Sequence, residues 1–462
     1  MRREETTQSV AEPLACVVER EAGQNAFLCY QCARCTSGCP VADNMDLTPS
    51  QLMRAIQLDD RAALESKSVW LCASCQTCTA RCPQNLDIAA IMDALRIESL
   101  RAGLPPAVPD VEVFSRLFLK NVDLFGRVYE IGLMAALNVA TRKPFANASL
   151  GLEMLKRGRL KFLPEMVKPA LRAPKVEQDA DTVAYYPGCS LHSTASEYDE
   201  TIHHVAGALG LKLVEPSGWT CCGSTPAHMC DHQLATALPL RNLATIERMG
   251  LDVVTAPCSA CYARTKNAEQ TVRPGDPAAL EVEKETGHRY RASVRVQHLI
   301  ETLLERAGTD RIARATTRPL TGLKVACYYG CLITRPPKVT GAGHPEYPMQ
   351  MEELLGALGA ESIDWSYKTD CCGATLGLTQ TGLAMGMSRK ILENARACGA
   401  DMVAAACPMC HVNLDARQSQ MGLGFNLPVL YVTQLMAWAF GFNAKESGLN
   451  KNIVDPRPAL AL

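Results

Sequence analysis

Short apolar runs alternate with amphipathic stretches over the part of the chain that begins near residue 181. The runs have the length of strands, and stretches with helical spacing lie between them, such as 193–209 and 231–249. The runs are "TVAYY" (182–186), "LKLVE" (211–215), "LDVVTA" (251–256), "LKVACYY" (323–329) and "DMVAAA" (401–406). Strands that alternate with helices build a parallel sheet covered on both faces. The pattern therefore predicts α/β domains in this part.

The chain before residue 181 shows helical patterns instead. Leu52, Ile56 and Leu64 have helix-like spacing, and Thr48 followed by Pro49 is a typical cap and first turn. Prolines at "GLPPAVPD" end this first unit near residue 103. Residues 111–162 are predicted as helices whose apolar residues form either a core or a partner surface: Phe114, Leu117, Phe118, Phe125, Tyr129, Leu133 and Leu137.

Length and composition restrict the type of protein. A chain of 462 residues is expected to divide into about three units. The net charge of −1 gives no global field for nucleic acid, and the basic run "KRGRLK" (156–161) is predicted to be a solvated surface. The apolar stretches 131–140 and 435–442 are too short to span a bilayer, and no secretory signal pattern is present. We therefore expect a cytoplasmic protein without direct membrane insertion.

Twenty-two cysteines are the most unusual feature of the composition. The cytosol keeps thiols reduced, so a disulfide framework is not expected, and most of these residues are predicted to be metal ligands or redox groups.

Two cysteine runs in the first unit have the spacing C-x2-C-x2-C-x3-C-P. They comprise Cys29, Cys32, Cys35 and Cys39 before Pro40, and Cys72, Cys75, Cys78 and Cys82 before Pro83. This spacing is typical of two-cluster ferredoxins, in which the fourth cysteine of each run binds the other cluster. We assign Cys29, Cys32, Cys35 and Cys82 to one 4Fe-4S cubane, and Cys72, Cys75, Cys78 and Cys39 to the second. Two zinc sites are the alternative, but zinc ligands are usually spaced as CxxC pairs.

A unit of roughly 145 residues is duplicated in the second part of the chain. The offsets are 142, 150 and 149 residues for Cys189 to Cys331, Cys221 to Cys371, and Cys258 to Cys407. Each copy presents one cysteine, then Cys-Cys-Gly, then Cys-x-x-Cys. The domains we expect are a tail (1–20), a helical ferredoxin (21–103), a helical extension and linker (104–180), and two repeats (181–320 and 321–462).

The cysteines of each repeat follow predicted strands, at the sheet edge where open α/β sheets bind ligands. Five thiols are then expected to converge, which is one more than a cubane needs. Adjacent cysteines in a regular strand point to opposite faces, so the pair needs an irregular loop, which Gly223 and Gly373 permit.

These residues resemble a known family. Residues 181–462 resemble the CCG-domain proteins typified by the B-type component of heterodisulfide reductase. Residues 20 to about 180 resemble its C-type component, including the segments "GRVYE" and "RGRLKFLP". The resemblance implies two noncubane 4Fe-4S clusters, held by Cys189, Cys221, Cys222, Cys258 and Cys261, and by Cys331, Cys371, Cys372, Cys407 and Cys410.

The resemblance also implies a function. Electrons pass from a flavin-containing A-type subunit, and from other input subunits, through the cubanes to the paired noncubane clusters, where a disulfide or related sulfur substrate is reduced or formed. The alternative is a non-catalytic electron relay in a larger flavin-containing complex, such as those of glycolate or glycerol-3-phosphate oxidation or of aromatic-ring reduction. No nucleotide-binding glycine motif is present, so flavin is expected only on partners.

Several remaining motifs are assigned structural roles. Cys16, Cys230, Cys327 and Cys398 are predicted to be core residues, since free cysteine is among the most buried residue types. "CPMCH" (407–411) matches a haem-attachment pattern, but His411 is predicted to pack or donate a hydrogen bond near a cluster. "HMCDH" (228–232) is a poor zinc site, and the charged segment 273–290 is expected to be an exposed loop.

Overall fold

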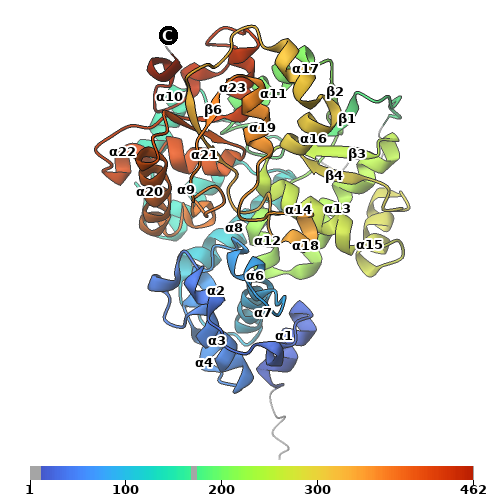
Figure 1. The fold of residues 1–462 in the computed structure, drawn as a ribbon. Coiled ribbons are helices and arrows are strands. Elements are labelled where there is room, and N and C mark those ends of the chain that lie inside the picture. Colours follow the sequence, from blue (N-terminus) through green and yellow to red (C-terminus); the bar gives the residue numbers. More distant parts are fainter. Residues whose placement is uncertain (1–11, 168–173, 461–462) are drawn as a thin grey trace, which may run out of the picture. The chain divides into compact units, whose positions relative to one another are not determined.

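A computed structural model describes residues 12–167 and 174–460, and its chain divides into two compact units (Figure 1). One unit comprises residues up to 72 together with 76–109, and the other comprises 73–75 together with 110–462. No helix in the described ranges is both long and apolar enough to cross a membrane. Within the expected helical extension and linker (104–180), residues 168–173 lie outside the described residues.

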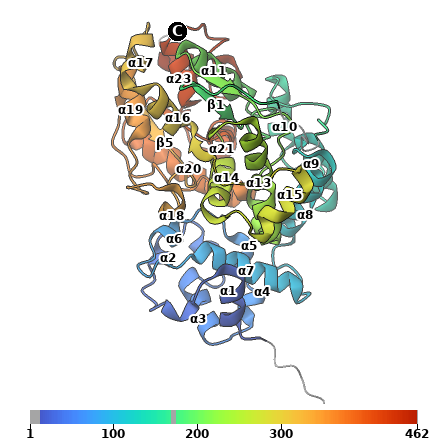
Figure 2. The same cartoon turned by 90° about the vertical axis from the view of Figure 1, so that its right-hand side faces the viewer.

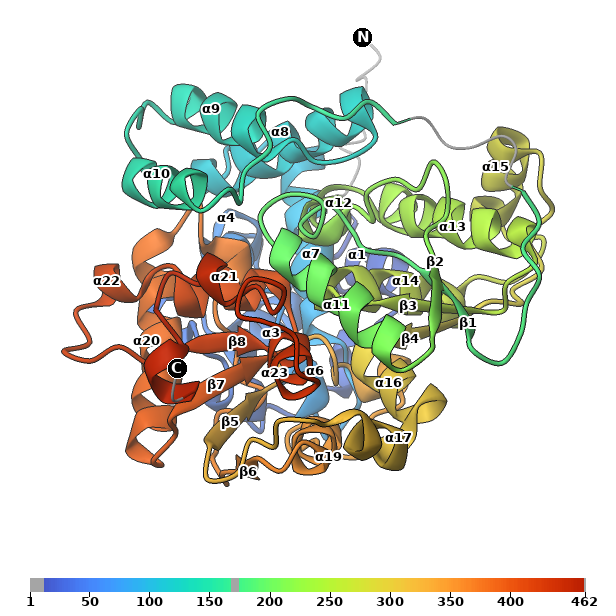
Figure 3. The ribbon, with the colours of Figure 1, turned by 90° about the horizontal axis from the view of Figure 1, so that it is seen from above.

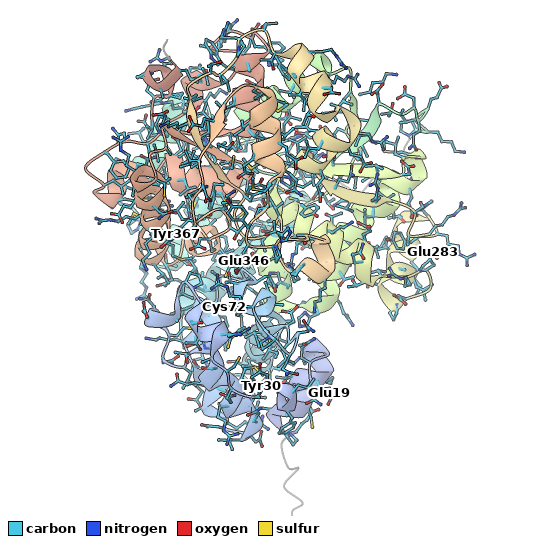
Figure 4. The ribbon with its side chains drawn as sticks, in the orientation of Figure 1. Glu19, Tyr30, Cys72, Glu283, Glu346 and Tyr367 are labelled. Atoms are coloured by element: carbon cyan, nitrogen blue, oxygen red, sulfur yellow. The ribbon has the colours of Figure 1, made fainter. Side chains whose placement is uncertain are left out.

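The described residues of the smaller unit form helices and no strands. They are α1 (Leu14–Ala22), η1 (Ala26–Leu28), α2 (Arg34–Ser37), η2 (Ala42–Asn44), α3 (Pro49–Gln57), α4 (Ala62–Glu65), α5 (Ser68–Leu71), α6 (Thr77–Ala80) and α7 (Ile88–Arg101). The predicted start of α3 is confirmed, and the Thr48 amide donates to Gln51 Oε1 over 2.8 Å. Residues 14–20, expected in the tail, lie in α1, because Leu14, Val17 and Val18 form a buried face that packs against α7. Figure 4 marks Tyr30 and Cys72.

The larger unit begins with three helices, as the pattern over 111–162 predicts. They are α8 (Pro109–Phe125), α9 (Glu130–Ala140) and α10 (Ala148–Lys156). Figure 3 shows these three helices along one side of the unit. Phe118, Leu133 and Leu137 are buried, whereas the other apolar residues predicted here are partly exposed.

Two four-stranded parallel sheets follow, which confirms the predicted duplication. The first has the order β2-β1-β3-β4 and comprises β1 (Thr182–Tyr185), β2 (Lys212–Val214), β3 (Val253–Ala256) and β4 (Arg295–His298). The second has the order β6-β5-β7-β8 and comprises β5 (Lys324–Tyr328), β6 (Glu361–Ser362), β7 (Met402–Ala405) and β8 (Val429–Tyr431). All strand pairs are parallel.

Helices connect the strands of both sheets. The first repeat has α11 (Ser196–Ala208), α12 (Ser224–Cys230), α13 (His232–Met249), α14 (Ser259–Thr271), α15 (Pro277–Thr286), α16 (Leu299–Arg306) and α17 (Gly308–Ala315). The second has α18 (Pro337–Thr340), α19 (Gln350–Ala357), η3 (Ala374–Leu376), α20 (Thr381–Ala397), α21 (Pro408–Asp415), α22 (Gln418–Met421), α23 (Val432–Ala439), η4 (Leu449–Lys451) and η5 (Arg457–Leu460).

The two repeats share one apolar core. Helix α11 of the first repeat packs against α23 of the second, and α16 of the first packs against α19 of the second (Figure 2). The same two kinds of helix therefore meet twice, once in each direction between the repeats. One core cluster includes Tyr198 and Ile202 of the first repeat together with Met351 and Leu435 of the second. The shared core fixes the two sheets relative to each other.

Two expectations about surface segments are wrong. The segment 273–290 is not an exposed loop: it contains α15, marked by Glu283 in Figure 4, and buries Ala279 and Val282 against α13. The run "KRGRLK" is not entirely a solvated surface, because Arg159 is fully buried. Its guanidinium Nη2 lies 3.0 Å from Glu197 of the first repeat, and Nη1 lies 3.9 Å from Asp415 of the second.

Candidate functional site

The two cysteine runs of the first part share an unusual backbone geometry. Gln31 and Ala33 have positive φ angles of 63° and 60°, and their counterparts Ser74 and Gln76 have φ angles of 51° and 60°. Such left-handed residues are uncommon outside glycine. Their matching positions give both runs the same backbone geometry between the first and third cysteines.

The fourth cysteines of the runs lie on segments that pack together within the smaller unit. A Cβ atom placed on Gly38, just before Cys39, would lie 2.7 Å from a guanidinium nitrogen of Arg81, just before Cys82. Helices α2 and α6, which carry Cys35 and Cys78, are also in contact. This proximity is what an exchange of the fourth ligands requires.

The predicted cysteines of the first repeat converge on one place. The Sγ atoms of Cys222 and Cys261 are 3.4 Å apart. Cys221 interacts through its side chain with Cys189, and Cys258 does so with Cys261. We call these five residues the first cysteine set.

The second cysteine set has the same internal contacts. The Sγ atoms of Cys372 and Cys410 are 3.4 Å apart, Cys371 contacts Cys331, and Cys407 contacts Cys410. All five thiols line one small cavity, of about 40 Å³. Each set therefore gathers the five thiols that the sequence predicts.

The two sets also meet each other. The side chains of Cys258 and Cys407, which occupy equivalent positions in the two repeats, are within hydrogen-bonding contact. Each occupies the N-cap position of a helix, α14 or α21, and neither side chain makes a capping hydrogen bond.

Glycines on both sides of the cysteine loops allow this crowding. Gly188 and Gly330, each just before the first cysteine of its set, have φ angles of 74° and 71°. A Cβ atom at these positions would lie 2.7 Å from Cys261 Sγ and 3.0 Å from Cys410 Sγ, respectively. The glycines predicted from the Cys-Cys-Gly motif, Gly223 and Gly373, also have positive φ angles. The role of the earlier pair was missed, although the repeat aligns Gly188 with Gly330.

A buried tyrosine supports each Cys-Cys loop. Tyr186 donates its hydroxyl to the Thr220 carbonyl over 2.7 Å, and Tyr328 donates to the Asp370 carbonyl over 2.6 Å. Burial holds the pKa of both phenols well above the ordinary range, so each hydroxyl remains a donor. The two carbonyls belong to the residues just before the adjacent cysteines, so the tyrosines fix where both loops begin.

The helical extension contributes to the first set. The Val128 amide donates to Cys189 Sγ over 3.4 Å, and the Cys221 amide donates to the Gly126 carbonyl over 2.9 Å. Both come from the segment "GRVYE", which therefore closes one side of the first set.

Four cysteines belong to neither the two runs nor the two sets. Cys327 is buried in β5, where its thiol lies 3.7 Å from Ser362 Oγ, as expected for a core residue. Cys16 and Cys398 are exposed and Cys230 is partly buried, so the core prediction is wrong for Cys16 and Cys398. Cys16 lies on the face of α1 opposite its buried residues, and Cys398 follows the last turn of α20.

His411 packs in the core of the second repeat, as predicted. It is fully buried, stacks on Tyr431 at a ring distance of 4.1 Å, and lies 3.3 Å from the Asn452 amide. Within residues 12–167 and 174–460, no three His, Cys, Asp or Glu side chains converge tightly enough to hold a single metal ion. This includes "HMCDH". Within each cysteine set, the thiols contact one another in pairs. A cluster does not need its ligands to meet at one point, because they bind several irons.

Comparisons with known proteins agree with this arrangement. The family described as "Cysteine-rich domain" (CCG) matches residues 183–265 and 325–415, and "4Fe-4S dicluster domain" matches residues 28–87. The 8-methylmenaquinol:fumarate reductase membrane anchor subunit of Wolinella succinogenes is 32% identical over 277 residues, which cover 59% of this chain and 96% of that protein.

Other relatives are components of heterodisulfide reductases. The B-type component of the ferredoxin:CoB-CoM heterodisulfide reductase of Methanosarcina mazei is 34% identical over 251 residues, or 51% of this chain and 82% of that protein. The C-type component of the enzyme in Methanosarcina acetivorans is 37% identical over 76 residues, or 16% of this chain and 31% of that protein. A hypothetical protein from Helicobacter pylori shares the fold, with a TM-score of 0.61, 11% identity, and coverage of 97% of this chain and 76% of that one.

Proposed function

The chain belongs to the iron–sulfur proteins of the heterodisulfide reductase family, with a C-type ferredoxin before a B-type pair of CCG domains, and we propose that it is a catalytic subunit of such a complex. In this proposal, the two cysteine runs hold two cubane 4Fe-4S clusters, with Cys39 and Cys82 exchanged between them. The two cysteine sets hold a noncubane cluster each.

The observation that supports catalysis is the contact between Cys258 and Cys407. A simple relay needs one cluster after another, whereas this contact places two equivalent sets face to face. Reduction of a disulfide needs two electrons and two protons and yields two thiols, so two adjacent one-electron centres suit both sulfurs of one substrate. The clusters would supply the one-electron chemistry. The cysteine thiols are positioned by two pairs of residues of this chain, Gly188 with Gly330 and Tyr186 with Tyr328.

A second candidate is the non-catalytic electron relay in a larger flavin-containing complex that was considered from the sequence. It is favoured by the relative named as a subunit of an 8-methylmenaquinol:fumarate reductase, which aligns over nearly its whole length. In both proposals, a flavin-containing partner exchanges electrons with the ferredoxin part.

Metal analysis and EPR of the anaerobically purified chain test these proposals. Four clusters of four predict about 16 irons per chain, and zinc in place of iron would exclude both. Addition of candidate disulfides to the oxidised or half-reduced protein is expected to produce a new paramagnetic signal. Absence of such a signal for every disulfide tested, in protein with full iron content, would favour the second candidate.

A further inference from the structure

An arginine side chain supports the Cys-Cys loop of each repeat. Arg127 Nε donates to the Trp219 carbonyl over 3.2 Å, and Arg335 Nη1 donates to the Thr369 carbonyl over 2.9 Å. Trp219 and Thr369 each lie two residues before the adjacent cysteines, so the two guanidinium groups bind equivalent carbonyls. The same position in both repeats is therefore next to a positive charge.

The two arginines come from different parts of the chain. Arg335 belongs to the second repeat itself, four residues after Cys331, whereas Arg127 belongs to the helical extension. The repeat offset of 142 residues pairs Arg335 with Ser193, which carries no charge. Duplication of one arginine therefore does not explain the match. The extension supplies to the first set the charge that the second repeat supplies to its own set.

Each arginine pairs with a glutamate that is more exposed. Arg127 Nη1 lies 2.9 Å from Glu165, and Arg335 Nη2 lies 3.6 Å from Glu346, which is labelled in Figure 4. The arginine side chains are 11% and 1% exposed, whereas the glutamate side chains are 52% and 43% exposed. Because water screens the half-exposed carboxylates, the arginine charge of each pair acts more strongly within the protein than the glutamate charge does.

Both guanidinium groups are held next to residues of the cysteine sets. Arg127 and Cys189 line one small cavity, of about 20 Å³, and the amide of Val128 donates to Cys189 Sγ. Arg335 makes a second bond to its loop, from Nη2 to Thr369 Oγ1 over 2.8 Å. Each charge is therefore fixed beside one set.

Other cations near the sets do not repeat in this way. Lys368 lies in the second repeat, but its Nζ atom is 2.6 Å from Glu352, and both side chains are buried, so the two charges largely cancel at a distance. Gly218 is the equivalent of Lys368 in the first repeat. Arg264 acts on the first set only, since Asn413 is its equivalent in the second repeat.

We propose that Arg127 and Arg335 each regulate the electron affinity of one noncubane cluster through a fixed positive charge. Reduction by one electron adds one negative charge to a cluster, and a nearby cation stabilises the reduced form. Net charge and hydrogen bonding around the sulfurs are among the factors that set cluster potentials. The arginines act through the cysteine loops, so they are positioning residues. This inference rests on the proposed clusters and names residues that set their potentials.

The test is a redox titration of the full-length, cluster-loaded chain, followed by EPR under anaerobic conditions with dithionite as the reductant. Arg127→Gln removes the charge but keeps an amide that can donate to the Trp219 carbonyl. Reduction of the first cluster is expected to become at least about tenfold less favourable, which is a shift of about 59 mV to lower potential for one electron. Arg127→Lys keeps the charge and is expected to stay within about threefold of the native chain.

Glu165→Gln is expected to have the opposite sign. It removes the carboxylate that pairs with Arg127, so reduction of the first cluster should become about two- to threefold more favourable, a smaller effect because solvent screens this group. Glu346→Gln is expected to do the same for the second cluster. The matched control is Arg295→Gln, which removes an exposed arginine at the start of β4, whereas the cysteine loops follow strand ends. Its potentials are expected to equal those of the native chain.

Iron analysis accompanies each titration, so that a lost cluster is distinguished from a shifted one. With full iron content, an unchanged potential in Arg127→Gln, or an equal shift in Arg127→Lys, would overturn the proposal. If Arg127→Gln loses iron, Glu165→Gln decides: a rise in potential supports the proposal, and no rise overturns it. Failure of the disulfide proposal appears differently, as a native chain with full iron content but no disulfide signal, and does not affect these potentials.

Discussion

The substitution Gly188→Ala tests the assignment of the first cysteine set most directly. Gly188 has a φ angle of 74°, and the added Cβ atom would lie 2.7 Å from Cys261 Sγ. Real Cβ atoms do not approach other heavy atoms this closely, so either the Cys261 thiol or the loop before Cys189 must move. Both belong to the same set.

The magnitude follows from two terms. A left-handed alanine costs about 1–2 kcal/mol relative to glycine, and overpacking of a close contact costs a further 1–3 kcal/mol, roughly. The total of about 2–5 kcal/mol destabilises the arrangement in which Cys189 and Cys261 converge. We therefore expect the loss of one cluster, so that iron falls from about 16 to about 12 per chain.

Gly322→Ala is the matched control for this substitution. Gly322 has a φ angle of 82°, but a Cβ atom there meets nothing within 4 Å, so only the backbone cost of about 1–2 kcal/mol applies. Gly330→Ala faces Cys410 Sγ at the longer distance of 3.0 Å and is expected to have an intermediate effect on the second set. Iron and sulfide analysis with EPR measures all three variants. If Gly188→Ala retained the iron content and EPR signals of Gly322→Ala, the convergence of Cys189 and Cys261 on one cluster would be refuted.

Three further predictions concern other parts of the larger unit. Cys258→Ser is expected to lower the iron content, whereas Cys327→Ser, which removes a thiol buried in β5, is expected to leave it unchanged in the same analysis. Arg159→Met leaves Glu197 and Asp415 buried without their cation and is expected to lower the free energy of unfolding by about 3–5 kcal/mol in a denaturant titration. The control Arg116→Met breaks an exposed ion pair with Glu112 and should lower it by less than about 1 kcal/mol. Equal effects of the two variants would contradict a buried role for Arg159. Burial raises the pKa of the Glu130 carboxyl from 4.5 to about 7, so its ionisation opposes folding progressively as pH rises from about 4.5 to 7. Glu130→Gln should therefore raise the thermal midpoint of unfolding at pH 8 but not at pH 5. A rise at pH 5 alone would contradict this direction of the pKa shift.

The sequence predicted several elements because their signals are local. β1, β3, β5 and β7 are short apolar runs, and a cysteine loop follows each of them. β4, β6 and β8 were missed, and β6 and β8 have separate reasons. β6 is only two residues long, and β8 runs directly into the apolar helix α23, so periodicity does not separate them. Arg159 was assigned to the surface because its neighbours in sequence are charged, and nothing local reveals the buried carboxylates that receive it.

The sequence by itself determined the number, spacing and duplication of the cysteine motifs, and thereby the iron–sulfur family. These features survive in the linear order because ligand spacing within one loop is set by local backbone geometry. The tertiary structure decided what the repeats do together. The contact of Cys258 with Cys407, the pairing of Arg159 with both repeats, and the hydrogen bond from Arg127 to the first repeat all join residues far apart in the chain. Such contacts depend on how the shared core packs the two sheets and the extension, and no local pattern encodes that packing.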